Sequence, residues 1–220
     1  MTDPNNPTGD RPRRRHPDPT PSGEGFRPEP LDLIAFRREQ AAQVLAARIP
    51  ARFAAARADN PQVARWVARY LTNPTEAPSL VMVGPTGTGK THQCWGAIRA
   101  IVEGLADTGR GLDWRATTHP DLNAALRPKV DGSHNTALQL HMTTALLLLD
   151  DLGAGKSTDW TEDTLYRLVD HRWSHRLPTI YSTNLPPPLL KTTVGERVVS
   201  RLGDAMRVSI TGTDRRWKAA

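Results

Sequence analysis

The sequence predicts an α/β fold, a five-stranded parallel sheet with helices on both faces, and three observations support it. From residue 80 onward, short apolar runs alternate with longer segments of helical periodicity. The run at residues 145–149 is almost pure leucine, which is typical of a strand buried on both faces. Strands that are separated by helices are joined by right-handed crossovers and therefore pair in parallel.

The first 30 residues have a different composition. They hold 8 of the 19 prolines, with five acidic residues and five arginines. Such a segment buries too little apolar surface to offset the entropy of ordering it. We therefore expect a disordered Pro/Arg-rich tail over residues 1–30, an N-terminal helix over residues 31–49 and the main domain over residues 50–220. A basic cluster at residues 11–15 is either solvated tail or a contact for phosphates.

The elements are expected in a regular order. Apolar residues at helical spacing begin at Leu31, and Pro50 ends that helix. Asn60 can cap a second helix, with Pro61 at its first position. We expect strands at residues 80–83, 112–117, 145–149, 179–182 and 207–211, and helices at residues 91–103, from about 120, at 161–175 and near 195–202.

Residues 84–91, GPTGTGKT, match the phosphate-loop pattern G-x-x-x-x-G-K-[ST] at every required position. Glycines let successive backbone N–H groups wrap round a phosphate chain, and the following helix adds its positive dipole end. Lys90 is expected to reach the β- and γ-phosphates of ATP, and the Thr91 hydroxyl to ligate Mg²⁺. The predicted nucleotide-binding residues are Gly84, Pro85, Thr86, Gly87, Thr88, Gly89, Lys90 and Thr91.

A second run, GAGKS at residues 153–157, also ends in G-K-S but lacks the required first glycine. Asp150 stands at that position, and its carboxylate would repel phosphates. We interpret Lys156 as an exposed basic residue in a loop.

Two adjacent carboxylates follow the leucine-rich strand. Ligands bind at the carboxyl edge of open parallel sheets, where Asp150 and Asp151 are expected to lie. Asp150 is the candidate for holding Mg²⁺, directly or through water, and Asp151 for polarising the attacking water. The alternative is a simple helix-capping turn.

Charge and composition limit the partners. A net charge of +6 and a pI of about 10.0 permit contact with nucleic acid, although a basic surface also serves solubility. The longest apolar run falls far short of the ~20 residues of a membrane span. Cys94 is the single cysteine, which excludes an internal disulfide and a cysteine-based zinc site. We expect a soluble, cytoplasmic protein.

The motifs together resemble those of the DnaC/IstB group of AAA+ ATPases, which are helicase loaders and transposition helpers. The phosphate loop extended to His92 and the run LLLLDDLG at residues 146–153 carry this resemblance. The run PTIYSTN at residues 178–184 resembles the sensor 1 strand, and GERVVSRL at residues 195–202 resembles the box VII helix. GTDRR at residues 212–216 resembles the C-terminal basic element, and the whole match covers about residues 48–218.

The resemblance implies roles for individual residues. His92 belongs to the nucleotide site, and Asn184 faces the γ-phosphate. Arg201 is the arginine finger and Arg197 a second catalytic candidate, while Arg215 or Arg216 serves as sensor 2. Simpler interpretations are that Asn184 caps a turn, and that Arg197 and Arg201 pair with Glu196 or Asp204 on an exposed helix face. Trp66 and Tyr70 either flank the adenine or form helical core.

The resemblance also implies a function. It indicates an AAA+ P-loop NTPase core with little or no lid domain, forming a homo-oligomer with ATP and Mg²⁺ bound. Hydrolysis is expected to be slow, because Asp151 stands where glutamate is usual. We expect a loader for a replicative helicase in DNA replication that contacts single-stranded DNA. The alternatives are an IstB-like helper of a transposase, a small-molecule P-loop kinase and a DNA-binding adaptor without turnover.

Overall fold

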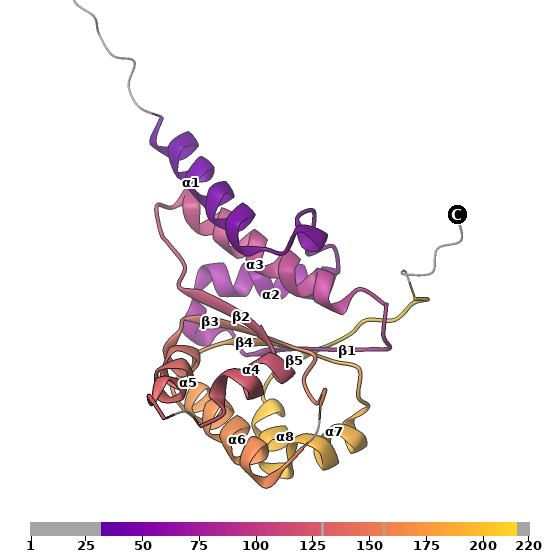
Figure 1. Cartoon of the computed structure of the whole chain (residues 1–220). Coiled ribbons are helices and arrows are strands. Elements are labelled where there is room, and N and C mark those ends of the chain that lie inside the picture. The colour runs from indigo at the N-terminus through magenta and orange to yellow at the C-terminus, as the bar shows by residue number, and fades with distance from the viewer. Residues whose placement is uncertain (1–31, 129, 156, 215–220) are drawn as a thin grey trace, which may run out of the picture. The chain divides into compact units, whose positions relative to one another are not determined.

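The computed structural model describes residues 32–128, 130–155 and 157–214 (Figure 1). The tail expected over residues 1–30, with its basic cluster at 11–15, lies outside the described residues. Lys156, Arg215 and Arg216 lie outside them as well.

Five strands form one parallel sheet in the order β2-β3-β4-β1-β5, as the sequence predicts. The order places β3, β4 and β1 side by side, so the carboxyl ends of these three strands are neighbours. The second strand begins two residues later than expected, and the third extends to Asp150. The strands are β1 (Leu80–Val83), β2 (Trp114–Thr118), β3 (Leu146–Asp150), β4 (Thr179–Thr183) and β5 (Met206–Ser209).

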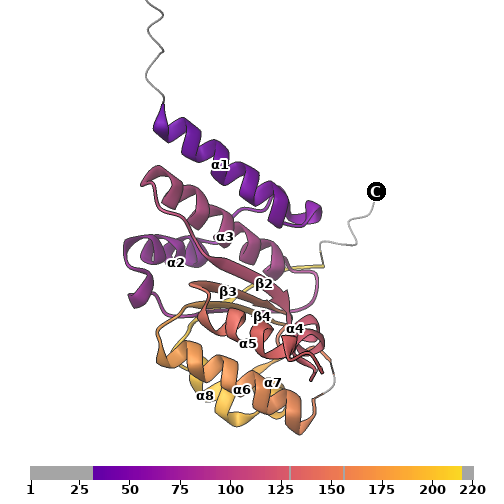
Figure 2. The same ribbon diagram turned by 60° about the vertical axis from the view of Figure 1, so that its left-hand side comes forward.

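Helices cover both faces of the sheet (Figures 1 and 2). Two single turns of 3-10 helix, η1 (Ala51–Phe53) and η2 (Pro74–Glu76), flank the second helix. On one face lie α1 (Leu33–Arg48), α2 (Pro61–Thr72) and α3 (Lys90–Asp107). On the other lie α4 (His119–Leu126), α5 (Ser133–Thr143), α6 (Asp159–Ser174), α7 (Pro187–Val194) and α8 (Glu196–Leu202).

The strand residues alternate between two cores. Leu146 and Leu148 pack with α1, α2 and α3, whereas Leu147 and Leu149 pack against the helices of the other face. All four leucines are at most 1% exposed, which confirms that this strand is buried on both faces. The buried strand therefore holds its last residue, Asp150, in a fixed position.

Local sequence signals explain the start of helix α2. The Asn60 Oδ1 accepts hydrogen bonds from the backbone N–H groups of Gln62 and Val63, so α2 is capped as expected. Trp66 and Tyr70 lie in the core, each 1% exposed, and the Trp66 indole donates to the Pro78 carbonyl at 2.6 Å. These two aromatics do not line the pocket beside the phosphate loop.

Two helices are absent from the sequence prediction. Helix α5 buries two of its hydrophobic residues, Leu138 and Met142, so its apolar periodicity is faint. Helix α7 begins within a run of three prolines, a pattern more often read as a loop, although proline suits the first turn of a helix. Among the described residues, no helix combines the length and the apolar character needed to cross a membrane.

Candidate nucleotide-binding site

The phosphate loop connects β1 to α3 at the carboxyl edge of the sheet. Gly84 lies against the backbone of Ile210, where a Cβ atom would collide with the carbonyl group. Gly87 and Gly89 have φ values of 80° and 102°, a region that side chains disfavour. The Thr88 hydroxyl closes the turn by donating to the Pro85 carbonyl at 2.9 Å. The glycine positions of the motif are thus fixed by backbone geometry.

Lys90 begins α3 and is almost fully buried. Its Nζ atom donates to the carbonyl oxygens of Gly84 and Pro85, both at 2.8 Å. The ammonium group therefore lies inside the curve of the loop, at the positive end of the helix dipole. This is the position from which a lysine can contact the outer phosphates of a nucleotide.

Three segments that are distant in sequence meet at Asp150. The Thr91 hydroxyl donates to Asp150 Oδ1 at 3.2 Å, across 59 residues of sequence. The Ser182 hydroxyl, from β4, donates to the same oxygen. Asp150 is 8% exposed, so these donors hold a nearly buried carboxylate in one orientation.

The oxygen atoms of Thr91 and Asp150 fit a Mg²⁺ ion. Mg²⁺ prefers oxygen ligands and is commonly held by one or two protein groups, with water and substrate phosphates completing the shell. Within the described part of the chain, no group of three or more His, Cys, Asp or Glu residues gathers into a metal cage. The pair therefore suits an ion that arrives with a nucleotide.

Asp151 points away from its neighbour. It has a φ value of 53°, which is uncommon for a residue with a side chain, and it is exposed at the pocket that the loop forms. Its backbone N–H donates to the Ser182 hydroxyl at 3.0 Å, and the N–H of Gly153 donates to His119 Nδ1 at 3.3 Å. Burial lowers the pKa of His119, so at neutral pH its ring is uncharged and accepts this bond.

Asn184 follows β4 and completes this side of the site. Its Nδ2 atom donates to the Thr86 hydroxyl at 3.3 Å, so the amide faces the phosphate loop. The capping role considered as an alternative is not needed to explain its orientation. The pocket has a volume of about 420 Å³ and is lined by Arg52, Phe53, Thr86, Gly87, Gly89, Lys90, Thr91, His92, Asp151, Ala154 and Asn184.

Sequence analysis missed Arg52 and Phe53, which reach the pocket from η1. Trp66 and Tyr70 are also aromatic residues upstream of the phosphate loop, so residue type alone does not single out Phe53. The Phe53 ring stacks on Trp95 of α3, with a centroid distance of 6.3 Å. The pocket is thus lined both by the phosphate loop and by an aromatic ring.

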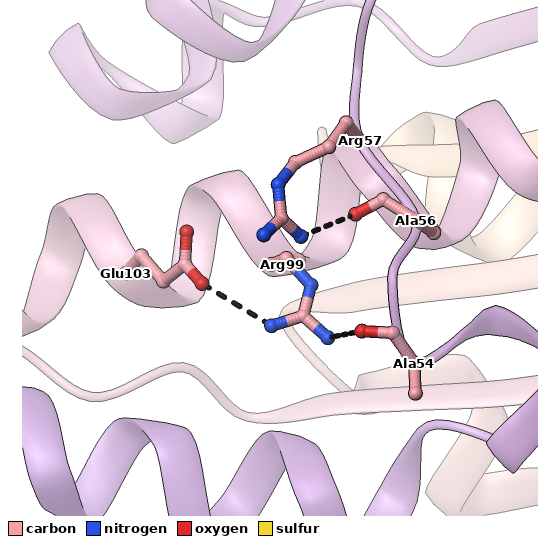
Figure 3. Close-up of polar contacts among 5 residues, drawn as sticks. All are labelled: Ala54, Ala56, Arg57, Arg99 and Glu103. Carbon is pink, nitrogen blue, oxygen red and sulfur yellow. Dashed lines mark hydrogen bonds and ion pairs between the residues drawn. The ribbon is translucent and has the colours of Figure 1, made fainter.

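The segment between α1 and α2 is fastened to α3 (Figure 3). The Arg99 side chain donates to the Ala54 carbonyl on one side and pairs with Glu103 at 3.3 Å on the other. The backbone of Arg57 packs so closely on Gly96 that a Cβ atom there would collide with it. The Arg57 N–H donates to His92 Nε2 at 3.3 Å, which ties the segment to the end of the phosphate loop.

The two arginines of α8 lie outside this pocket. Arg201 donates to Asp170 at 2.8 Å and lies over the Trp173 ring, whose centroid is 4.4 Å from the guanidinium carbon. Arg197 pairs with Asp163 at 2.9 Å. The alternative pairing with Glu196 or Asp204 is wrong, because both arginines reach across to α6 instead.

The last described residues return to the phosphate loop. The Asp214 carboxylate lies directly against Gly87. Arg215, the sensor 2 candidate, follows it and lies outside the described residues.

The comparison with protein families decides the assignment. A model of the IstB-like ATP-binding proteins matches residues 41–206, three quarters of the chain. The chain belongs to this family. The resemblance derived from the motifs is therefore confirmed, and the family is one of ATP-binding proteins.

Two curated proteins are similar to this member of the IstB-like family. The replicative helicase loader DnaI of Bacillus subtilis (strain 168) is 32% identical over 114 residues, which are 51% of this chain and 35% of DnaI. An ATP-binding protein in an insertion sequence of Mycobacterium tuberculosis (strain H37Rv) is 29% identical over 110 residues, 50% of this chain and 41% of that protein. The chain thus matches well under half the length of either relative.

Solved structures share the fold. The crystal structure of the DnaC helicase loader has a TM-score of 0.62 at 25% identity and covers 74% of this chain and 100% of that one. The DnaI crystal structure has a TM-score of 0.60 at 22% identity, covering 76% and 94%. AMPPCP-bound DnaA from Aquifex aeolicus has a TM-score of 0.58 at 22% identity, covering 71% and 48%. The AAA+ fold predicted from the sequence is confirmed.

Proposed function

We propose that this IstB-like protein is a Mg²⁺-dependent ATPase that loads a replicative helicase during DNA replication and contacts single-stranded DNA. The contact between Thr91 Oγ1 and Asp150 Oδ1 carries the ATPase part of the proposal. It brings a phosphate-loop hydroxyl and a strand-end carboxylate to 3.2 Å from each other, beside the buried ammonium group of Lys90. No simple capping turn accounts for that convergence.

The residues take the following roles in the proposed reaction. Lys90 binds the β- and γ-phosphates, and Thr91 and Asp150 hold the ion. Mg²⁺, when bound, supplies positive charge beside the phosphate oxygens. Asp151 accepts a proton from water as the water oxygen bonds to the γ-phosphorus and the bond to the β–γ bridging oxygen breaks. The products are ADP and inorganic phosphate, and Asn184 orients the γ-phosphate.

The proposed assembly is a homo-oligomer formed in the ATP state. Arg201 lies on α8, away from the pocket of its own chain, so its guanidinium serves a nucleotide bound by a neighbouring copy. Arg197 supports the same surface, and Arg215 supplies sensor 2 within its own chain.

A first experiment tests nucleotide binding. Lys90→Ala removes the cation inside the phosphate loop, so ATP affinity falls by at least about tenfold. Isothermal titration calorimetry with Mg·ATP measures the affinity, and Lys191→Ala, an exposed lysine of α7, is the matched control. Unchanged affinity in Lys90→Ala would mean that the loop does not bind the nucleotide.

A second candidate partner is a transposase, favoured by the insertion-sequence relative. The relative DnaI, a helicase loader, favours a replicative helicase as the partner. A pull-down with Asp151→Asn, held in Mg·ATP and compared with Mg·ADP, separates the two. Recovery of the replicative helicase with Mg·ATP but not with Mg·ADP supports the proposed role as a helicase loader. Recovery of a transposase supports the second candidate, and recovery of neither contradicts both. A small-molecule kinase has no support among these relatives.

A further inference from the structure

His119 is a buried polar residue that neither the sequence motifs nor the proposed reaction uses. It is 6% exposed and begins α4, directly after the last residue of β2. That last residue, Thr118, is the register partner of Asp150 at the end of β3. The segments that follow β2 and β3 therefore leave the sheet at the same edge, next to each other.

The start of α4 holds the backbone of His119 in place. The Thr118 hydroxyl accepts a hydrogen bond from the Asp121 backbone N–H at 3.1 Å and so caps the helix. Pro120 stands in the first turn, where its fixed φ suits a helix. Because this turn is capped and joined directly to a strand, its backbone has little freedom. The imidazole ring is therefore a rigid point of attachment for a neighbouring loop.

The loop that follows Asp150 is attached to β4 on one side. Ser182 accepts the N–H of Asp151 through its hydroxyl at 3.0 Å, and the N–H of Leu152 through its carbonyl at 2.7 Å. The Thr183 hydroxyl, also on β4, donates to the Leu152 carbonyl at 2.8 Å. These three hydrogen bonds fix the backbone of the first two residues of the loop.

His119 attaches the other side of the same loop. The N–H of Gly153 donates to His119 Nδ1 at 3.3 Å, and the N–H of Ala154 turns back to the Asp151 carbonyl at 2.9 Å. Gly153 has a φ value of 87°, as the third residue of a tight turn requires. Asp151 and Ala154, the two ends of this turn, both line the nucleotide pocket. A hydrogen bond to the middle of the turn therefore restrains residues that face the nucleotide.

The ring of His119 is suited to accept this hydrogen bond. Burial lowers the pKa of His119, so the ring is neutral at neutral pH and one of its nitrogens is an acceptor. Because Nδ1 accepts from Gly153, the proton of the ring lies on Nε2. The side-chain amide nitrogen of Asn123 is 3.4 Å from Nε2, and a half-turn of this amide presents its oxygen to that proton. Helix α4 thus supports the tautomer that the loop needs.

We infer that His119 is a positioning residue for ATP hydrolysis, which holds Gly153 and thereby keeps the Asp151 carboxylate at the nucleotide pocket. The inference rests on the proposed function, in which Asp151 accepts a proton from the attacking water. His119 does not line the pocket, so it acts through the loop and not by touching the nucleotide. Its loss lowers turnover and spares ATP binding, because Lys90 and Thr91 lie on a different segment.

His119→Phe removes the acceptor and keeps a ring of similar size. The kcat for ATP hydrolysis falls by about 10–10²-fold, the cost of a displacement of about 1 Å at a reacting group. The Kd of Mg·ATP, measured by isothermal titration calorimetry, stays within about twofold of the wild type. His119→Leu, which is smaller and also lacks an acceptor, gives the same result. His119→Asn restores most of the rate, because the amide oxygen of asparagine takes the place of Nδ1.

His141→Phe is the matched control. His141 is a half-buried histidine of α5 that does not line the nucleotide pocket, and its Nδ1 atom is 2.7 Å from the Ala137 carbonyl oxygen of its own helix. The variant loses the same ring and keeps full hydrolysis.

A double-mutant cycle tests whether His119 acts through Asp151. Once Asp151→Asn has removed the proton acceptor, the position of this side chain no longer sets the rate. In that background His119→Phe therefore lowers the remaining hydrolysis by less than about twofold. If His119 only supported the fold, the two losses would multiply.

The outcomes separate the inference from the function on which it rests. A wild-type kcat in His119→Phe and His119→Leu, an equal loss in His119→Asn, or losses that multiply in the double variant overturn the inference alone. Binding of Mg·ATP that weakens in parallel with kcat also overturns it, because His119 would then support the whole pocket. Full hydrolysis by Asp151→Asn contradicts the proposed function itself, whatever the His119 variants do.

Discussion

At the scale of single residues, the backbone at Asp151 separates two neighbouring carboxylates. If the strand continued, the side chains of Asp150 and Asp151 would point to opposite faces of the sheet. The left-handed conformation at Asp151 ends the strand and turns this side chain into the pocket. Asp150 stays against Ser182 and Thr91. One carboxylate is thereby held by two hydroxyl groups, and the other is exposed at the pocket.

The two aspartates therefore give different defects. Asp151→Asn keeps the shape of the site but removes the proton acceptor, so Mg·ATP binds normally and turnover falls by about 10²–10⁴-fold. Asp150→Asn leaves the acceptor and weakens the response of binding and turnover to Mg²⁺. Phosphate release at varied Mg²⁺ concentration measures both effects.

Asp159→Asn, an exposed aspartate at the start of α6, is the control for this pair and leaves both quantities unchanged. Full hydrolysis by Asp151→Asn would exclude this residue as the acceptor of the proton.

At the scale of elements, the segment between α1 and α2 forms a wall of the pocket. Arg99 and Gly96 of α3 hold it, and η1 presents Phe53 to the pocket. In the proposed function the phosphate loop binds the triphosphate, so the Phe53 ring is left for the base. This division predicts that the affinity for a nucleotide depends on η1, whereas the affinity for phosphates alone does not.

Phe53→Ala tests that division. Stacking of a base on an aromatic ring contributes roughly 1–3 kcal/mol, so ATP affinity is expected to fall by about tenfold. Affinity for tripolyphosphate, which has no base, stays unchanged. Phe36→Ala is the matched control, because Phe36 is a half-exposed phenylalanine of α1 that does not line the pocket. Equal losses for ATP and tripolyphosphate would mean that Phe53 supports the loop and not the base.

Part of the fold and of the candidate site could be predicted from the sequence alone. The strands and α2 were predictable because each carries its own signal, such as buried leucines or the Asn60 cap. The phosphate loop and the aspartates follow from short motifs. No motif marks Phe53, because its place in the pocket depends on stacking with Trp95 and on the hydrogen bond from Arg99 to the Ala54 carbonyl. Helix α5 was missed for a related reason, because tertiary packing and not periodicity defines it.

At the scale of the whole molecule, the nucleotide pocket and Arg201 lie at opposite edges of one sheet. The nucleotide pocket is at the carboxyl edge, whereas Arg201 lines a second pocket beside Ser79 and Pro178, which precede β1 and β4 at the amino edge. A guanidinium on that side cannot neutralise charge in its own pocket. Hydrolysis is therefore expected to depend on contact between copies, and the rate per subunit to fall on dilution through the range in which the protein assembles.

Arg201→Ala tests this dependence directly. The variant binds ATP normally, because its own pocket is intact, but loses about 10³–10⁵-fold in hydrolysis, the range found for arginine fingers. Lys90→Ala is equally inactive for the opposite reason, since it keeps Arg201 and lacks the phosphate-binding cation. In a mixture of the two, some interfaces pair an intact phosphate loop with an intact Arg201, so part of the activity returns. A mixture as inactive as its components, with a wild-type rate per subunit that is constant on dilution, would assign Arg201 to the structural contact with Asp170 alone.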